Sequence, residues 1–384
     1  MQLVAYGAQD IYLTGNPQIT FFKVVYRRHT NFSMEAIEQT WDGTEVADAE
    51  ARCTSTIARN GDLLYRMYLE IEGQPADNRQ NFTAASIVNI DLEIGGQLID
   101  RQTGQWMNVW SHLTEPNPSA HVGTVDSDKD EGTHFQNMSG MGGAFGDDGS
   151  ANIKLWVPLQ FWFCRNAGLS LPLIALQYHE VIVKLTHNFG TDNFVSITSN
   201  KLWADYIYLD TDERRRFAQV SHEYLIEQVQ ENTIETTSHS KLNFNHPVKE
   251  LIWVVNATTG VLASVASGTT TYKLQLNGHD RFKARDFRYF TRTQVWQHHT
   301  GCGGLDASLA GSDNKNGALN DGIAVYSFAL KPEEHQPSGT CNFSRIDDAK
   351  IVVGGPAASA TKIYAVNYNV LRIMSGMGGL AYSN

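Results

Sequence analysis

The sequence has little cysteine and none of the short motifs that build common catalytic sites. Its 384 residues include four cysteines, which lie far apart at positions 53, 164, 302 and 341. Without a Cys-x-x-Cys or His-x-His pair, the spacing typical of zinc sites and of metal-dependent β-sandwich enzymes is missing. A P-loop is excluded because no Gly-Lys dipeptide occurs, and a hydrolase nucleophile elbow because no Gly-x-Ser-x-Gly occurs. We therefore expect no catalytic residue, no cofactor-binding residue and no metal ligand.

The chain also lacks a long apolar segment and an excess of basic charge. No run approaches the roughly 18 apolar residues that span a bilayer, and residues 1–7 do not resemble a signal peptide. With 30 Lys and Arg against 41 Asp and Glu, the net charge of -11 would repel nucleic-acid phosphates. Basic clusters at 27–29, 214–216 and 281–292 are interpreted as parts of ion pairs within or between subunits. The sequence thus predicts no direct binding of nucleic acid.

Short stretches rich in β-branched and aromatic residues, bounded by Gly, Asn, Asp or Pro, are abundant, and they are typical of strands. The predicted strands are 34–41, 63–71, 87–94, 153–158, 181–187, 202–209, 251–255, 272–276, 323–330, 349–353 and 362–371. In the last one Tyr364, Val366, Tyr368 and Val370 alternate with other residues, which predicts one apolar face against a core. Many short strands with long loops indicate β-sandwiches.

One helix is predicted among the strands. Between Thr103 and Leu113, large apolar side chains recur at Trp106, Val109 and Trp110, which is the spacing of one helix face. The hydroxyl of Thr103 is placed to cap this helix. A single helix beside a long loop is an addition to a β scaffold, and this argues against a Rossmann-like fold.

Two segments of the chain resemble each other. Residues 92–101 and 274–283 each contain strand residues, a tight turn with glycine at the same place, and a return strand. An aromatic-rich segment follows each copy, and then a glycine-rich loop, at 115–152 and at 299–322. We interpret the match as a duplicated domain, the alternative being a chance match of one hairpin.

The boundary between two domains is expected in the charged run 209–217, which separates a strand from the next apolar segment. The residues of this interdomain join are Asp212, Glu213, Arg214, Arg215 and Arg216. The loop 115–152 is expected at an exposed end of its domain, because it contains little apolar surface to bury. Residues of this loop and of 299–322 are candidates for outer loops. Their charged outer-loop residues are Asp126, Asp128, Asp130, Glu131, Asp147, Asp148, Asp313 and Lys315.

The N-terminal sequence carries a resemblance to a known family. Residues 2–32, QLVAYGAQDIYLTGNPQITFFKVVYRRHTNF, closely resemble the start of major capsid proteins of nucleocytoplasmic large DNA viruses. Further pieces agree in the same order at 92–101, 212–217, 336–345 and 364–383. The resemblance spans nearly the whole chain, and the algal-virus and mimivirus-like members are the most similar.

This resemblance implies an all-β fold of two consecutive eight-stranded antiparallel jelly rolls, a double jelly roll with long loops and few short helices. The implied division is an N-terminal basal arm at 1–30, a first jelly roll at 31–211 and a second at 212–384. Arm residues expected to serve assembly at the base of the particle are Tyr6, Asp10, Tyr12, Phe21, Phe22, Tyr26, Arg27, Arg28 and His29.

The implied function is structural. Three copies would form a homotrimeric capsomer of nearly hexagonal outline that tiles the icosahedral shell of a large DNA virus. Implied partners are neighbouring capsomers, minor capsid proteins and penton proteins, close to an internal membrane. The implied location is the virion, assembled in viral factories of the host cytoplasm.

Two other classes of function stay open. Jelly rolls also form lectins, and Trp156, Trp162 and Trp296 would be the side chains to stack on sugars in a carbohydrate-binding module. Their apolar neighbours, however, predict that all three are buried. An enzyme is a residual alternative, since no motif supplies a nucleophile, a base or a metal.

Overall fold

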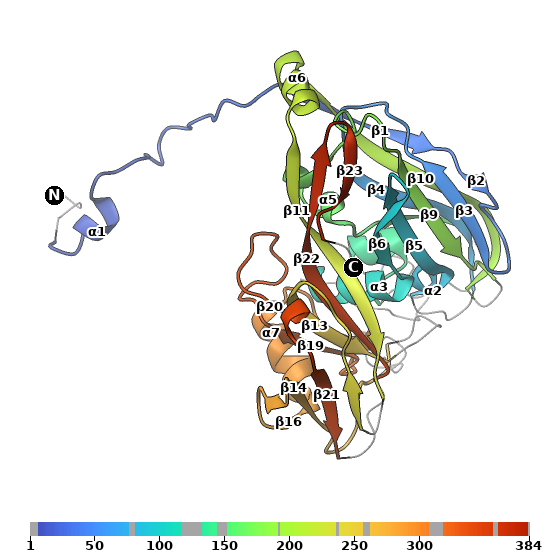
Figure 1. Cartoon of the computed structure of the whole chain (residues 1–384), viewed down its shortest axis with the longest axis vertical. Helices are drawn as coiled ribbons and strands as arrows, with labels where there is room; N and C mark the ends of the chain where they lie inside the picture. The colour runs from blue at the N-terminus through green and yellow to red at the C-terminus, as the bar shows by residue number, and fades with distance from the viewer. Residues whose placement is uncertain are drawn as a thin grey trace.

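Two β-sandwiches form the body of the computed structural model, and an N-terminal arm extends away from both (Figure 1). The structure describes residues 7–76, 81–116, 133–143, 152–190, 193–235, 238–255, 262–306, 318–355 and 360–382. The expected all-β class is confirmed, because strands make up both sandwiches and most helices are short.

The first sandwich follows the arm. Its strands are β1 (Phe32–Gln39), β2 (Asp42–Gly43), β3 (Ala51–Thr56), β4 (Leu63–Pro75), β5 (Ile87–Ile94), β6 (Gln97–Gln102), β7 (Ile153–Pro158), β8 (Leu171–Pro172), β9 (Val181–His187) and β10 (Phe194–Leu209). One sheet has the order β1-β10-β4-β7, with β8 beside β4, and the other has the order β2-β3-β9-β5-β6. The first strand pairs antiparallel with the last along its whole length, which closes the sandwich.

The second sandwich repeats this arrangement. Its strands are β11 (His222–Thr233), β12 (His239–Lys241), β13 (Pro247–Val254), β14 (Thr271–Leu276), β15 (His279–Asp280), β16 (Arg285–Asp286), β19 (Ile323–Ser327), β20 (Cys341–Asn342), β21 (Ala349–Gly354), β22 (Lys362–Met374) and β23 (Met377–Leu380), with a separate pair β17 (Leu305–Asp306) and β18 (Ala318–Leu319). The two sheets have the orders β11-β22-β13-β19 and β12-β21-β14-β15. Each position therefore has a counterpart in the first sandwich, as expected for two jelly rolls.

The two similar sequence segments form equivalent hairpins. Strands β5 and β6 meet at Gly95 and Gly96 with φ of 59° and 79°, and β14 and β15 meet at Asn277 and Gly278 with φ of 50° and 76°. In a two-residue hairpin, positive φ at both central residues gives the turn type whose twist matches that of the two flanking strands. The similarity of the two segments is therefore structural as well as sequential.

Helices connect and cover the strands. They are α1 (Ile11–Thr14), α2 (Phe82–Ser86), α3 (Gly104–Thr114), α4 (His134–Ser139), α5 (Trp162–Arg165), α6 (Thr211–Gln219) and α7 (Gln294–His298), with a π-helical turn at Tyr289–Thr293 and 3-10 turns at Ala167–Leu169 and Phe343–Arg345. The predicted helix is confirmed as α3, and its cap is as expected, since the hydroxyl of Thr103 accepts a hydrogen bond from the Trp106 amide at 3.1 Å.

Helix α3 lies between the two sandwiches, where it does more than decorate a scaffold. Its apolar face packs on strands of the second sandwich, and the indole of Trp106 lies 5.1 Å from the ring of Tyr364. For this reason β22 buries both faces near its middle, whereas its alternation predicts one apolar face. Burial of a large side chain such as Trp106 stabilises a fold by about 2–3 kcal/mol, so the shared core couples the two sandwiches.

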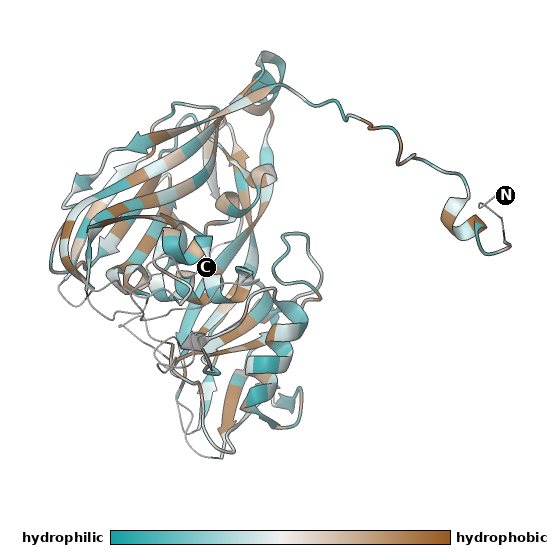
Figure 2. Cartoon of the chain, turned by 180° about the vertical axis from the view of Figure 1, so that it is seen from behind, coloured by the Kyte–Doolittle hydropathy of each residue, from teal (hydrophilic) through white to brown (hydrophobic). Residues whose placement is uncertain are grey.

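Strand residues alternate between hydrophobic and hydrophilic along much of both sandwiches (Figure 2). In β4 the side chains of Met67, Leu69 and Ile71 are buried, while those between them are half-buried. A period of two places alternate side chains on opposite faces of a sheet. In the sheet β1-β10-β4-β7 one face thus supplies the core, and the other is left for partners or solvent.

Candidate functional site

The N-terminal arm exposes apolar side chains that a protein in water normally buries. Its described part, residues 7–31, leaves the body near α6 and points away from both sandwiches (Figure 1). Phe21 is 91% exposed, Phe22 98% and Tyr26 86%. The arm's backbone hydrogen bonds are local, from Asp10 to Gly7 and within α1. The arm therefore presents an uncovered apolar segment, which is typical of a surface that binds another molecule.

The structure places the other predicted arm residues on this same segment. Tyr12 is exposed, Asp10 accepts a hydrogen bond from the Gly7 amide at 2.7 Å, and His29 contacts Phe32 through a tilted ring contact of 5.9 Å. Arg27 and Arg28 are exposed as well. Tyr6 lies outside the described residues.

The predicted interdomain join forms a helix. Asp212, Glu213, Arg214, Arg215 and Arg216 lie in α6, and this helix buries no side chain. Arg214 contacts the first sandwich through an ion pair of 2.9 Å with the buried Asp62. The other two arginines are exposed, so α6 adds positive charge at the end of the body from which the arm leaves.

The predicted outer-loop residues cannot be placed. Asp126, Asp128, Asp130, Glu131, Asp147, Asp148, Asp313 and Lys315 all lie outside the described residues. The parts of the two loops that the structure describes contradict a uniformly exposed position, because Met141 is 1% exposed and belongs to the first core. The Gly142 amide donates to the side-chain oxygen of Asn108 at 3.0 Å and the Gly143 amide to that of Asn81 at 2.7 Å, so asparagine side chains hold this glycine-rich turn inward.

The second loop begins with a segment that caps helix α3. The amides of Gly301 and Gly303 donate to the carbonyls of Leu113 and His112 at 2.7 and 3.1 Å, and the hydroxyl of Thr300 donates to Thr114 O at 3.0 Å. The last carbonyls of a helix have no partner within the helix. Here the second sandwich supplies those partners, which fixes its position relative to the first.

A cluster of buried charges lies beside this cap. Glu227 accepts from Lys249 at 2.9 Å and from Arg165 at 3.0 Å, and His335 lies 3.3 Å away. Arg165 comes from the first sandwich and also stacks over Trp110 at 4.6 Å. Burial raises the pKa of Glu227, but these three basic groups lower it further, to about 2. The carboxylate therefore stays charged and joins the two sandwiches.

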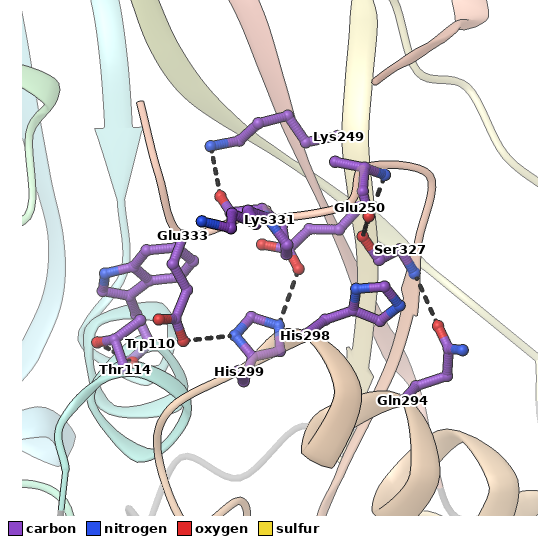
Figure 3. A network of polar contacts seen from close by, with 12 residues as sticks. Trp110, Thr114, Lys249, Glu250, Gln294, His298, His299, Ser327, Lys331 and Glu333 are labelled. Carbon is purple, nitrogen blue, oxygen red and sulfur yellow. Dashed lines mark hydrogen bonds and ion pairs between the residues drawn. The ribbon is translucent and has the colours of Figure 1, made fainter. Parts of the chain in front are cut away.

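His299 extends the cluster. Its ring lies between the carboxylates of Glu250 and Glu333, at 2.9 and 3.0 Å (Figure 3). Burial lowers the pKa of His299, but the two carboxylates raise it more, to about 9. The structure therefore buries His299 as a charged group.

The cluster has the features of a structural joint. Among the described residues, no group of His, Cys, Asp and Glu side chains is arranged to hold a metal ion. Beside the cluster lies an open cleft of about 460 Å³, lined mainly by residues of the first half of the chain, such as Arg66, Tyr68 and Arg165, with Glu333 from the second. Arg165 is already bound by Glu227 and stacked over Trp110, so the charge of this arginine is satisfied within the chain.

Comparisons with known proteins agree with this architecture. A family model described as "Major capsid protein N-terminus" matches residues 20–210, and one described as "Large eukaryotic DNA virus major capsid protein" matches residues 213–379. The major capsid protein of Pyramimonas orientalis virus is 51% identical, and the alignment covers 100% of this chain and 99% of that protein. This chain belongs to the major capsid protein family of large eukaryotic DNA viruses.

Other members support the assignment. The major capsid protein of Paramecium bursaria Chlorella virus 1 is 38% identical over 100% of this chain and 99% of its own length. The crystal structure of PBCV-1 VP54, fitted into a reconstruction of the virophage Sputnik, matches with a TM-score of 0.77 and 35% identity, covering 95% of this chain and 100% of VP54. The Faustovirus major capsid protein matches with a TM-score of 0.65 at 12% identity, which shows a shared fold. The resemblance seen in residues 2–32 is thus confirmed as family membership.

The three tryptophans considered for sugar binding differ in this capsid protein. Trp162 is buried, as expected, but Trp156 is 38% exposed and Trp296 is 81% exposed. The expectation that apolar neighbours bury all three was therefore wrong for two of them. The two exposed rings come from different sandwiches, β7 in the first and α7 in the second, and form no shared platform within the chain.

The residues that join the sandwiches of the capsid protein were not predicted. A signal was present, since Lys249 and Glu250 interrupt the apolar strand 247–254. Charged residues inside such a strand indicate a buried ion pair, because an unpaired buried charge is costly.

No described helix is long and apolar enough to cross a membrane.

Proposed function

We propose that three copies of this chain form a homotrimeric capsomer of nearly hexagonal outline, the tile of an icosahedral shell. The observation that carries the proposal is the pair of sandwiches with matching strand order in one chain. Three chains then contribute six similar sandwiches, so a threefold assembly has pseudo-sixfold shape and can pave a hexagonal lattice. The domains are an arm at 1–30 and jelly rolls at 31–211 and 212–384, which agrees with where β1 begins and α6 lies.

The arm and α6 mark the base of the capsomer in this proposal. The exposed aromatic side chains of 21–26 and the basic residues 27–29 would bind minor capsid proteins, close to an internal membrane. The predicted outer loops would then face away from the shell, at the other end of the sandwiches. Penton proteins and neighbouring capsomers complete the set of partners.

The role is structural, without catalysis, cofactor or direct contact with the genome. The relatives named above are capsid proteins, and the net charge of -11 disfavours binding to phosphates. The protein belongs to the virion, and we place its assembly in viral factories of the host cytoplasm.

Mass measurement tests the proposal. Purified protein should have a mass of about 128 kDa, three times the chain mass of 42.7 kDa, by light scattering at micromolar concentration. Electron microscopy of the same sample should show hexagonal tiles with a threefold axis. A monomer in neutral buffer would overturn the proposal.

A further inference from the structure

A basic and aromatic surface lies on the second sandwich, around helix α7. Trp296 is 81% exposed, and the neighbouring Leu330, whose carbonyl lies 3.3 Å from the His298 ring, is 78% exposed. The side chains of Arg285 and Arg292 are exposed on the same segment. We call this set the Trp296 surface and include Arg281, which like Arg285 lies near Tyr326. An exposed tryptophan beside arginines is the composition typical of an energetic centre of a protein interface.

The charges of this surface have incomplete partners within the chain. Arg292 forms a two-point ion pair with Asp321 at 2.7 and 2.8 Å. Arg285 lies 4.2 Å over the ring of Tyr289, and within the described residues no carboxylate pairs with Arg281 or Arg285. Positive charge is therefore available to an acidic partner.

The rest of the chain supplies an acidic partner of the right kind. Residues 32–211 contain 10 Lys and Arg and 24 Asp and Glu, whereas residues 212–384 contain 17 Lys and Arg and 16 Asp and Glu. The first sandwich is thus strongly acidic and the second is nearly neutral. Opposite potentials steer association and fix which surfaces meet, so first sandwiches repel each other and favour second sandwiches.

The outer face of the sheet β1-β10-β4-β7 combines aromatic rings with carboxylates. Tyr68 and Trp203 stack there at 6.4 Å, and Trp156, opposite Glu70 in the strand register, is 38% exposed. Burial, and then the carboxylates of Asp205 and Glu70, raise the pKa of Tyr68. Bases lie on the same face, since Lys154 pairs with Glu70 at 3.3 Å and Glu72 at 3.1 Å, Lys201 pairs with Glu38, and Arg66 lies near Asp205. The four carboxylates outnumber the three bases, so the face keeps a small negative charge beside the rings, which suits arginine.

We propose that the Trp296 surface of one copy docks on this outer sheet face of a second copy. The two surfaces belong to different sandwiches, so the contact is heterologous, and repeating it around a threefold axis closes a ring. The inference rests on the proposed trimer and names the surfaces that hold it together. The occupant is a second copy because its first sandwich carries the negative charge and the aromatic rings that complement the arginines of the Trp296 surface.

Photocrosslinking of the full chain tests the contact directly. A benzophenone side chain is placed at position 296, and this protein is assembled with an equal amount of isotope-labelled wild type. Mass spectrometry should then find crosslinks to peptides of β4, β7 or β10 that carry the other isotope pattern. Crosslinks to the same chain, to other surfaces or to nothing would overturn the docking, while a mass near 128 kDa would leave the trimer itself intact.

Substitution of Trp296 measures independently how much this contact contributes to the stability of the trimer. Trp296→Ala should raise the concentration at which the trimer dissociates about thirtyfold, the effect of losing a strong interface residue. Tyr178→Ala is the matched control, because Tyr178 is 75% exposed and lies off both surfaces. An unchanged dissociation concentration for Trp296→Ala, or an equal change for the control, would contradict the proposal.

Charge reversal tests whether opposite charges hold the two surfaces together. Arg281→Glu with Arg285→Glu should weaken the trimer, and adding Asp205→Lys should restore part of the loss. The matched control reverses two exposed arginines on α6, Arg215→Glu with Arg216→Glu, which changes the net charge equally. Equal weakening by the control, or no rescue by Asp205→Lys, would show that these surfaces do not meet.

Discussion

Gly301 lies where a side chain has no room. A Cβ atom there would overlap the carbonyl of His112 and come within 2.6 Å of Leu113 O, the two groups that this segment caps. We expect Gly301→Ala to lower the free energy of unfolding by about 2–4 kcal/mol, because backbone atoms cannot move aside as a flexible side chain can. Urea denaturation followed by tryptophan fluorescence measures the change.

Gly168→Ala is the control for this substitution. Its Cβ would meet only the side-chain oxygen of Asn166, at 3.3 Å, so the loss should stay below about 1 kcal/mol. Similar losses for both variants would mean that the capping contact between the sandwiches contributes little.

His299 makes stability depend on pH in the alkaline range. Its pKa is about 9 in the folded chain against 6.5 as the ordinary value, so the folded state holds a proton that the unfolded state releases. The stabilisation is complete below about pH 6.5 and is lost as the pH rises towards 9, with a full size of about 3 kcal/mol. His299→Gln should therefore flatten the decline of unfolding free energy between pH 6.5 and 9.

Urea titrations at several pH values check this expectation. The exposed His239→Gln is the control and should keep the slope of the wild type. A His299→Gln variant with an unchanged slope would show that the ion pairs with Glu250 and Glu333 do not set the alkaline limit.

At the scale of elements, strands with regular apolar patterns were predictable and polar ones were not. The bounds of β5, β7 and β9 agree with the prediction, and α3 starts one residue after its expected cap. Strands β11 and β3 were missed, because HEYLIEQVQENT and ARCTST are rich in polar residues. Pairing with a neighbouring strand stabilises such polar segments as strands, since β11 pairs with β22 along its whole length.

The candidate assembly residues were predictable only in part. The assembly role of the arm stays a prediction from the sequence, whereas the buried charge cluster, which was not predicted, depends on residues far apart in the chain. Arg165 and Glu227 meet only after both sandwiches have folded. No local pattern in the sequence encodes such a pair. Trp296 was predicted to be buried because its exposure likewise depends on the fold and not on its neighbours in the sequence.

The arm gives an element-scale prediction. Deleting residues 1–31 should leave the thermal midpoint of the body within about 1 °C, because the described arm makes no backbone hydrogen bond to the body. The same deletion should prevent association of capsomers with their partners, since the exposed Phe21, Phe22 and Tyr26 are lost. Calorimetry and electron microscopy of assembled shells measure the two effects.

A milder variant separates the arm's chemistry from its length. Phe21→Ser with Phe22→Ser keeps the whole arm and removes two rings. Normal shells from this variant would show that apolar contacts of the arm are not what assembly requires.

At the scale of the whole molecule, the two sandwiches share a core and should unfold together. The cluster around α3 joins residues of both, and Ile226, Leu371 and Ile373 of the second sandwich pack into the core of the first. The Tyr178 amide also donates to Gly376 O at 2.9 Å, which attaches the C-terminal hairpin β22–β23 to the first sandwich. A cooperative unit is expected where such contacts cross a boundary.

Two tryptophan substitutions test this coupling. Trp106 lies between the sandwiches and Trp253 lies in the core of the second, and both are at most 2% exposed. Each change to alanine should cost about 3–5 kcal/mol, so the two variants are matched in severity. Scanning calorimetry should show one transition for the wild type and for Trp253→Ala, and two transitions for Trp106→Ala, because only the latter weakens the shared core. Two transitions in the wild type would mean that the sandwiches unfold independently. The buried charges between them would then fix their relative position without making them unfold together.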